Sequence, residues 1–142
     1  GLAQLGKLDW FIEKRKHNFR RLYDGLKPFE KYFILPRATE NSDPSWFGFP
    51  ITVREETGIR RSDLVNYLER NKIMTRMLFG GNLTRQPAYE DVEYRIVGDL
   101  KNSDTVLNDT FFIGVYPGIT DEMIDYMIQV FRNFFSELGE KA

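Results

Sequence analysis

Two polar stretches of the sequence carry side chains that could contact a ligand. The first runs from Asn41 to Trp46 (NSDPSW), and the second from Phe79 to Pro87 (FGGNLTRQP), shortly after Arg76. Consecutive glycines let a backbone approach a bound molecule closely, and an arginine beside them offers two parallel donors to a phosphate or carboxylate. This combination indicates a loop that binds an anionic or polar ligand, although Gly-Gly-Asn is also typical of an ordinary turn.

Several kinds of chemistry are excluded by the residues that the chain lacks. It has no cysteine and a single histidine, His17, so it has no disulfide, no thiolate metal site and no cysteine nucleophile. It has no GxGxxG, GxxxxGK[ST] or GxSxG motif. The 20 basic and 21 acidic residues give a net charge of -1, which argues against a nucleic-acid partner. Apolar runs are far shorter than the ~20 residues that span a bilayer. With no visible leader, a cytoplasmic protein without a membrane partner is expected.

The length of 142 residues predicts one domain, residues 1–142, with a core of its own. An amphipathic helix is expected over residues 2–26, ended by Pro28, with apolar positions at Leu5, Leu8, Ile12, Phe19, Leu22 and Leu26. A last helix is expected after a capping Thr120, with an apolar stripe of Met123, Met127, Phe131, Phe134 and Leu138. Because the chain opens on Gly1 and runs directly into a helix, we expect it to be a piece of a longer protein.

The residues between these two helices predict a small sheet. Apolar runs over 46–53, 73–79 and 110–116 are rich in aromatic and β-branched residues and indicate strands. Pro50 places the first strand at an edge or a bulge, and a short helix is expected to follow Ser62 as its N-cap. Residues 36–45 are typical of a loop. The order predicts an α+β fold in which helices cover one face of a mostly antiparallel sheet.

The two polar stretches also carry a family resemblance. The strings NSDPSWFGFPIT (41–52) and GNLTRQP (81–87), together with GVYPG (114–118), resemble the C-terminal part of the DegT/DnrJ/StrS family of pyridoxal-phosphate-dependent nucleotide-sugar enzymes. The resemblance implies the small C-terminal domain of the aspartate-aminotransferase fold (PLP fold type I). It also implies that the long first helix links this domain to a large cofactor-binding domain that this chain does not contain.

Within that family, the chain is more similar to the sugar 3-dehydratases than to the aminotransferases. Phe79 and Thr84 stand where sister aminotransferases typically have Tyr and His, whereas Gln86 and Pro87 are shared. The resemblance implies a parent that removes the 3-hydroxyl of CDP-4-keto-6-deoxyglucose in lipopolysaccharide O-antigen biosynthesis. Two alternatives stay open: the same domain of a nucleotide-sugar aminotransferase, and a stand-alone interaction module.

The resemblance also implies how the work is divided in the parent. Pyridoxamine or pyridoxal phosphate, the catalytic His (Lys in an aminotransferase) and any iron–sulphur ligands would belong to the missing domain, and the full-length protein would be a homodimer. This chain alone would bind no cofactor and be inactive, and its part would be to close over a nucleotide sugar, a CDP-sugar in this branch. The substrate-binding residues that this implies are Trp46, Arg76, Phe79, Gly80, Gly81, Asn82, Arg85 and Asn108. For Trp46 and Phe79, a place in the core is the alternative, and for Arg76, a pair with a surface carboxylate.

Overall fold

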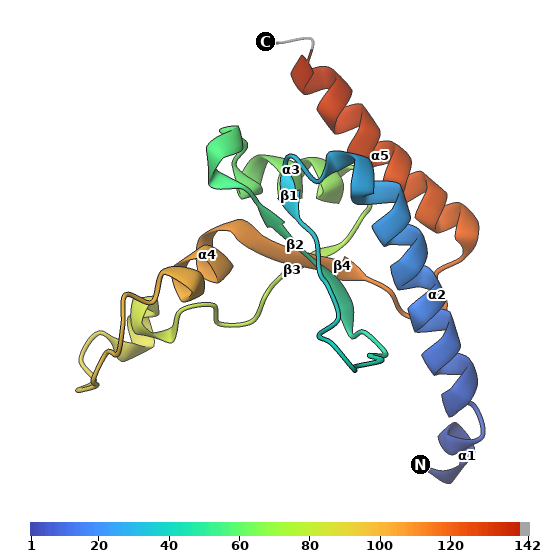
Figure 1. The fold of residues 1–142 in the computed structure, drawn as a ribbon, viewed down its shortest axis with the longest axis horizontal. Coiled ribbons are helices and arrows are strands. Elements are labelled where there is room, and N and C mark those ends of the chain that lie inside the picture. The colour runs from blue at the N-terminus through green and yellow to red at the C-terminus, as the bar shows by residue number, and fades with distance from the viewer. Residues whose placement is uncertain (140–142) are drawn as a thin grey trace.

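The computed structural model describes residues 1–139 and contains a four-stranded antiparallel sheet in the order β1-β2-β4-β3. The strands are β1 (Phe33–Ile34), β2 (Gly48–Val53), β3 (Thr75–Met77) and β4 (Thr110–Gly114). The helices are α1 (Leu2–Leu5), α2 (Leu8–Leu26), α3 (Arg61–Arg70), α4 (Lys101–Asp109) and α5 (Asp121–Gly139). Figure 1 shows α2 and α5 side by side next to the sheet, while the segment between β3 and α4 extends away from it.

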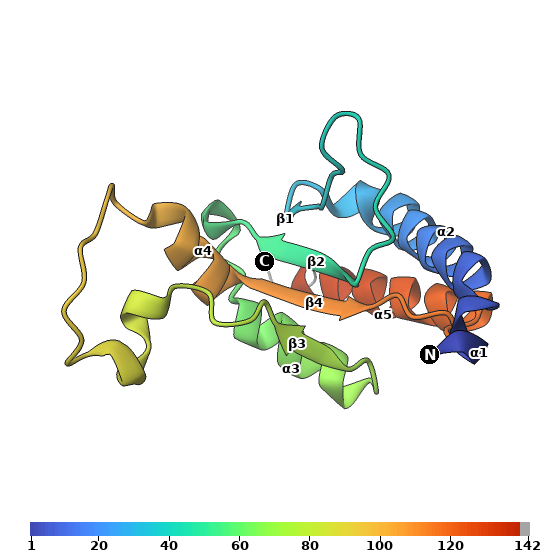
Figure 2. The same cartoon turned by 90° about the horizontal axis from the view of Figure 1, so that it is seen from below.

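The core lies on one face of the sheet. Phe49 and Ile51 of β2 pair with Ile113 and Phe111 of β4, and all four side chains are fully buried. Helices α2, α3 and α5 pack on this face, and their buried residues include Leu22, Leu26, Leu64, Leu68, Ile124 and Phe131. Figure 2 shows α3 and α5 on the same side of the sheet. The expected α+β fold, with helices on one face of an antiparallel sheet, is confirmed.

The first helix is shorter than the apolar pattern predicts. It is interrupted at Gly6, so that α1 ends at Leu5 and α2 begins at Leu8. Glycine disfavours a helix interior by about 1 kcal/mol relative to alanine, and Leu5 and Leu8 are exposed and supply no packing to offset that cost. The helical pattern therefore contributes to the core only in the C-terminal half of α2, which ends just before Pro28 as predicted.

The sheet contains one strand that the sequence does not reveal. β1 has only two residues and pairs with Thr52 and Val53 at the end of β2. The sequence predicts Pro50 at an edge or a bulge, whereas β2 is an inner strand. Because β1 stops short of Pro50, β2 has no strand partner on that side at this residue, which is an environment that a residue without an N–H tolerates.

The two expected helix caps have opposite outcomes. The expectation that Ser62 caps a helix is wrong, because α3 follows Arg60 and Ser62 lies within its first turn. The guanidinium of Arg60 pairs with Asp63 instead, at 2.9 and 2.8 Å. The expectation for Thr120 is confirmed, because its hydroxyl oxygen accepts a hydrogen bond from the Met123 N–H at 3.3 Å.

The apolar stripe of the last helix is mostly, but not wholly, in the core. Met127, Phe131 and Phe134 are buried as predicted, and Leu138 is partly buried against them. Met123 is exposed instead, because the side of α5 that enters the core begins at the neighbouring Ile124, which is fully buried, and Met123 lies off that side.

Candidate functional site

The loop that follows β3 is held against α4 by a hydrogen-bonded asparagine. Asn82 is 3% exposed, and its side-chain oxygen accepts bonds from the Thr84 N–H (3.1 Å) and the Thr84 hydroxyl (2.7 Å). Its amide nitrogen donates to Asp104 Oδ1 at 2.6 Å. Both ends of the amide are thus used within the protein, and Asn82 shapes the loop rather than standing open to a ligand.

Gly81 is required by the same contact with α4. Its φ is +57°, and a Cβ at this position would lie 2.6 Å from Leu107 Cα, a backbone atom. Gly80 has no such backbone neighbour, since a Cβ there would meet only the end of the Leu83 side chain at 2.9 Å. The Gly80 carbonyl accepts a hydrogen bond from Gln86 Nε2 at 2.9 Å, which closes the loop on itself. Packing on α4 therefore accounts for Gly81 without a ligand.

Arg85 presents its guanidinium at the surface beside an acidic partner. Its Nε and Nη2 each lie 3.3 Å from the Asp104 carboxylate. Hydrogen bonds from Arg85, and then from Asn82, lower the pKa of Asp104 below its usual value. An anion that approached Arg85 would share the guanidinium with this carboxylate.

The face of the sheet opposite the core carries an exposed aromatic cluster, which we call the open face. It consists of Phe47, Phe79 and Phe112, whose ring centroids are 5.7 to 6.4 Å apart. Phe47 and Phe79 are 70% and 76% exposed. Phe79 also has a φ of +50°, a left-handed conformation that is strained for a bulky residue. Strain and exposure at one aromatic residue are typical of a functional surface.

Arg76 borders this open face. It lies opposite Phe112 in the register of β3 and β4, and both line an apolar depression of about 610 Å³ that also contains Phe47. The Arg76 guanidinium donates to the Thr75 carbonyl at 3.2 Å and makes no ion pair within residues 1–139. A cation beside three aromatic rings can bind an anion that carries an apolar or ring-shaped group.

Trp46 and Asn108 lie apart from this cluster. The Trp46 ring stacks on Phe19 with centroids 4.4 Å apart and planes 4° apart, and it packs against the core. Asn108 is exposed at the end of α4, in a shallow depression shared with Arg60 and Ser62. Of the predicted substrate-binding residues, Arg76 and Phe79 therefore both lie beside Phe112 on the open face. The loop residues Gly81, Asn82 and Arg85 contact α4 instead, and Trp46 and Asn108 lie elsewhere.

Sequence analysis could not identify three residues of the open face and the adjacent loop: Phe47, Phe112 and Asp104. Phe47 and Phe112 occur within apolar runs that predict strands, and Asp104 lies in a segment of weak periodicity. Their roles depend on the pairing of β2 with β4 and on the packing of α4, which are long-range contacts.

His17, the only histidine, has a structural partner. Its Nε2 lies 2.8 Å from Asp121 Oδ1, and Arg21 Nη1 lies 2.7 Å from the other oxygen of that carboxylate. These contacts, first that of His17, lower the pKa of Asp121. Within residues 1–139 there is no cluster of side chains that could hold a metal ion, and no helix long and apolar enough to cross a membrane.

Residues 1–132 match the DegT/DnrJ/EryC1/StrS aminotransferase family, and the chain belongs to this family. It is 53% identical, over 95% of its length, to the lipopolysaccharide biosynthesis protein RfbH of Salmonella typhimurium. It is 52% identical, over 96% of its length, to the dTDP-4-dehydro-2,6-dideoxy-D-glucose 3-dehydratase of Saccharopolyspora spinosa. The chain covers 31% and 29% of these two relatives, so it spans about a third of their length.

A solved structure confirms the fold. The E. coli GDP-4-keto-6-deoxy-D-mannose-3-dehydratase, determined with bound hydrated PLP, superposes with a TM-score of 0.81 at 27% identity. The match covers 92% of this chain and 33% of that enzyme. The fold of the chain is thus that of part of a PLP-dependent enzyme of the aminotransferase class, as the sequence resemblance implies.

Proposed function

We propose that this chain is the small, substrate-closing domain of a nucleotide-sugar 3-dehydratase that works with pyridoxamine or pyridoxal phosphate in lipopolysaccharide biosynthesis. One observation carries the proposal: the chain is more than 50% identical in sequence to two relatives, of which one is a 3-dehydratase and the other a lipopolysaccharide biosynthesis protein. The departures at Phe79 and Thr84 from the aminotransferase pattern support the same branch.

This chain offers neither the catalytic histidine nor the iron–sulphur ligands that the resemblance implies for the parent. Cysteine is absent, and the only histidine is engaged with Asp121 between α2 and α5. In an enzyme of this kind the cofactor supplies the electron sink, and the protein supplies binding and orientation. We therefore assign no catalytic group to this chain and expect it to be inactive alone, with the cofactor held by the part of the parent that it lacks.

In the proposed parent, the open face lies over the substrate. Phe47, Phe79 and Phe112 exclude water from the reacting sugar, and exclusion of water strengthens the electrostatic contacts around it. Arg76 and Arg85 meet the pyrophosphate or sugar of the substrate, since a guanidinium can donate two hydrogen bonds to a phosphate. Gly80, Gly81 and Asn82 fix the loop that carries Arg85.

Trp46 and Asn108 have a smaller place in this proposal. Trp46 supports the loop before β2 from the core side, and Asn108 lies near the C-terminal end of α4. We retain both as candidate substrate contacts that depend on how the missing domain is placed. The nucleotide we propose is cytidine diphosphate, and the assembly a homodimer at full length.

The alternative is the same domain of a nucleotide-sugar aminotransferase. The two differ in the parent's cofactor-binding domain, where the family resemblance implies His for a dehydratase and Lys for an aminotransferase. A stand-alone interaction module, the further alternative, would function without any such domain. The reading frame upstream of Gly1 in the source locus separates all three, because a start codon directly before Gly1 would contradict both enzyme proposals.

The assay that tests the role of this chain uses the full-length parent. We expect it to eliminate the 3-hydroxyl of a CDP-4-keto-6-deoxy sugar, and we expect Arg76→Gln to raise KM more than it lowers kcat. Arg132→Gln is the matched control, because Arg132 is exposed on α5 and lines neither the open face nor its depression. Amino transfer without elimination, or equal KM values for the two variants, would contradict the proposal.

A further inference from the structure

A second depression lies between α2 and the loop that joins β1 to β2, and we call it the α2 hollow. Its volume is about 380 Å³, within the range of about 300–1,000 Å³ in which small ligands bind. Its walls include Phe19, Tyr23 and Trp46, and its cations are Lys16, Arg20 and Arg37. It shares no lining residue with the depression at Arg76, so it is separate from the open face.

The loop that forms one wall of the hollow is anchored to α2. The Arg15 guanidinium donates to the carbonyls of Trp46 (3.0 Å) and Phe47 (3.1 Å), and Lys16 Nζ lies 2.5 Å from Asp43. Together with the stacking of Trp46 on Phe19, these contacts fix an aromatic wall. This gives the polar stretch 41–46 a structural role, because its residues build one side of the hollow.

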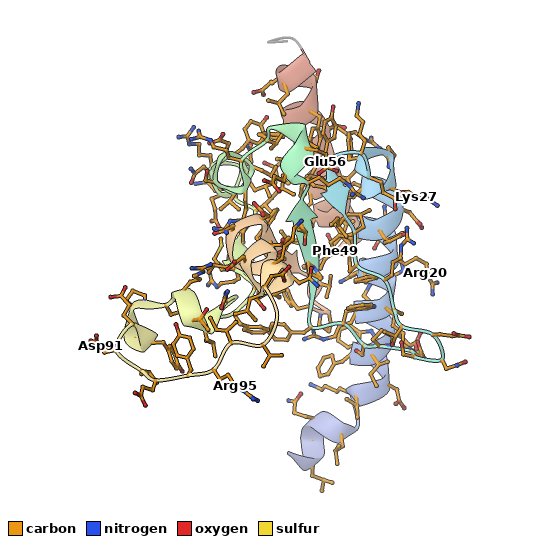
Figure 3. All side chains as sticks on the ribbon, turned by 60° about the vertical axis from the view of Figure 1, so that its left-hand side comes forward. Arg20, Lys27, Phe49, Glu56, Asp91 and Arg95 are labelled. Carbon is orange, nitrogen blue, oxygen red and sulfur yellow. The ribbon has the colours of Figure 1, made fainter. Side chains whose placement is uncertain are left out.

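The charges of the hollow are unbalanced. Asp43 is its only acidic lining residue, and it is paired with Lys16. Arg20 makes no ion pair within residues 1–139, and the mostly exposed Arg37 lies 3.8 Å from Glu30, at the limit of an ion pair. Figure 3 shows Arg20 projecting from α2 into solvent. Arg20 therefore has no acidic partner among the described residues and Arg37 has only a distant one, so both guanidinium groups can bind an anion at the rim of an aromatic cavity.

We propose that the α2 hollow binds a nucleoside phosphate, with the base along the aromatic wall and the phosphate between Arg20 and Arg37. Flat rings gain from contact with aromatic side chains, and guanidinium groups match phosphate geometry. A free phosphate would leave the aromatic wall unused, and a purely apolar ligand would leave both guanidinium groups unpaired. The proposal goes beyond the proposed function, because the substrate is assigned to the open face.

The test uses tryptophan fluorescence of the 142-residue chain. Trp10 and Trp46 are its two tryptophans, so Trp10→Phe leaves Trp46 as the only reporter, inside the hollow. We expect CMP to change Trp46 fluorescence saturably, and cytidine and inorganic phosphate to bind more weakly. CDP-glucose is compared with CMP: equal or weaker binding of CDP-glucose assigns the site to a free nucleotide, whereas tighter binding would place the substrate itself in the hollow and overturn the separation of the two sites.

Substitution of the two arginines tests the geometry. Arg20→Gln with Arg37→Gln is expected to weaken CMP binding about tenfold or more, which is the loss of about one charge-assisted hydrogen bond. Arg132→Gln on α5, outside the hollow, is expected to leave binding unchanged, and far-UV circular dichroism verifies the fold of each variant. Failure of CMP to saturate would overturn the proposal, as would equal affinity for inorganic phosphate or an equal loss in Arg132→Gln. Because Arg76 does not line the hollow, the proposed function can fail or succeed independently.

Discussion

Replacement of Gly81 by alanine tests whether the loop after β3 is held by its contact with α4. The new Cβ would be placed at a φ of +57° and 2.6 Å from Leu107 Cα. The left-handed conformation costs an alanine about 1–2 kcal/mol, and overpacking against a backbone that must shift adds about 1–3 kcal/mol. We therefore expect Gly81→Ala to lower the free energy of unfolding by about 2–5 kcal/mol.

Two other glycines separate these contributions. Gly58 has a φ of +69° with open space around its would-be Cβ, so Gly58→Ala should show the backbone cost alone, about 1–2 kcal/mol. Gly80 lacks the positive φ, and a Cβ there meets only the flexible Leu83 side chain, so Gly80→Ala should cost less than Gly81→Ala. Urea unfolding gives the three values, and hydrogen exchange in α4 shows whether the loop opens locally. If Gly81→Ala costs no more than Gly58→Ala, the contact with Leu107 does not hold the loop.

Three further predictions concern single contacts. Because Arg85 holds the pKa of Asp104 below its usual value, the pair stabilises the fold above the usual carboxyl pKa and loses this effect as the pH falls through the lowered one. Unfolding free energies measured against pH should therefore converge for wild type and Asp104→Asn at low pH, and parallel curves would contradict this. Thr120→Ala should cost about 1 kcal/mol in urea unfolding, whereas Ser62→Ala, which removes no cap, should stay within about 0.5 kcal/mol; equal losses would refute the assignment of the cap. Phe79→Asn should raise thermal stability by up to about 1 kcal/mol, because asparagine tolerates a positive φ, and a loss of stability would show that contacts among the aromatic rings outweigh the strain.

Sequence analysis predicts those parts of the fold that depend on local periodicity. Residue types at fixed spacing predict the apolar runs that become β2, β3 and β4. They also predict the buried half of α2 and the Thr120 cap. β1 is not predicted because two residues are too few to show a periodicity, and most of α4 is not predicted because its sequence is polar. The exposure of Met123 likewise depends on which side of α5 faces the core, and that side includes Ile124 rather than Met123.

The candidate site is likewise only partly predictable from the sequence. Sequence analysis finds the loop after β3, but it interprets Gly81 and Asn82 as ligand contacts because their partners are far away in the chain. Leu107 and Asp104, which account for both residues, become neighbours only when α4 packs on the loop. A residue type that suits a ligand also suits a tight contact with protein, and only the long-range neighbour distinguishes the two.

The stretch before β2 illustrates how one motif can serve two surfaces. Trp46 turns toward α2 and stacks on Phe19, whereas Phe47 joins the rings of Phe79 and Phe112 on the open face. Successive residues of an extended chain point to opposite sides, so this division needs no special backbone. The Arg15 guanidinium binds the carbonyls of both residues and fixes them together. A ligand in the α2 hollow would therefore contact the residue next to the open face, and Arg15 provides the physical link between the two surfaces.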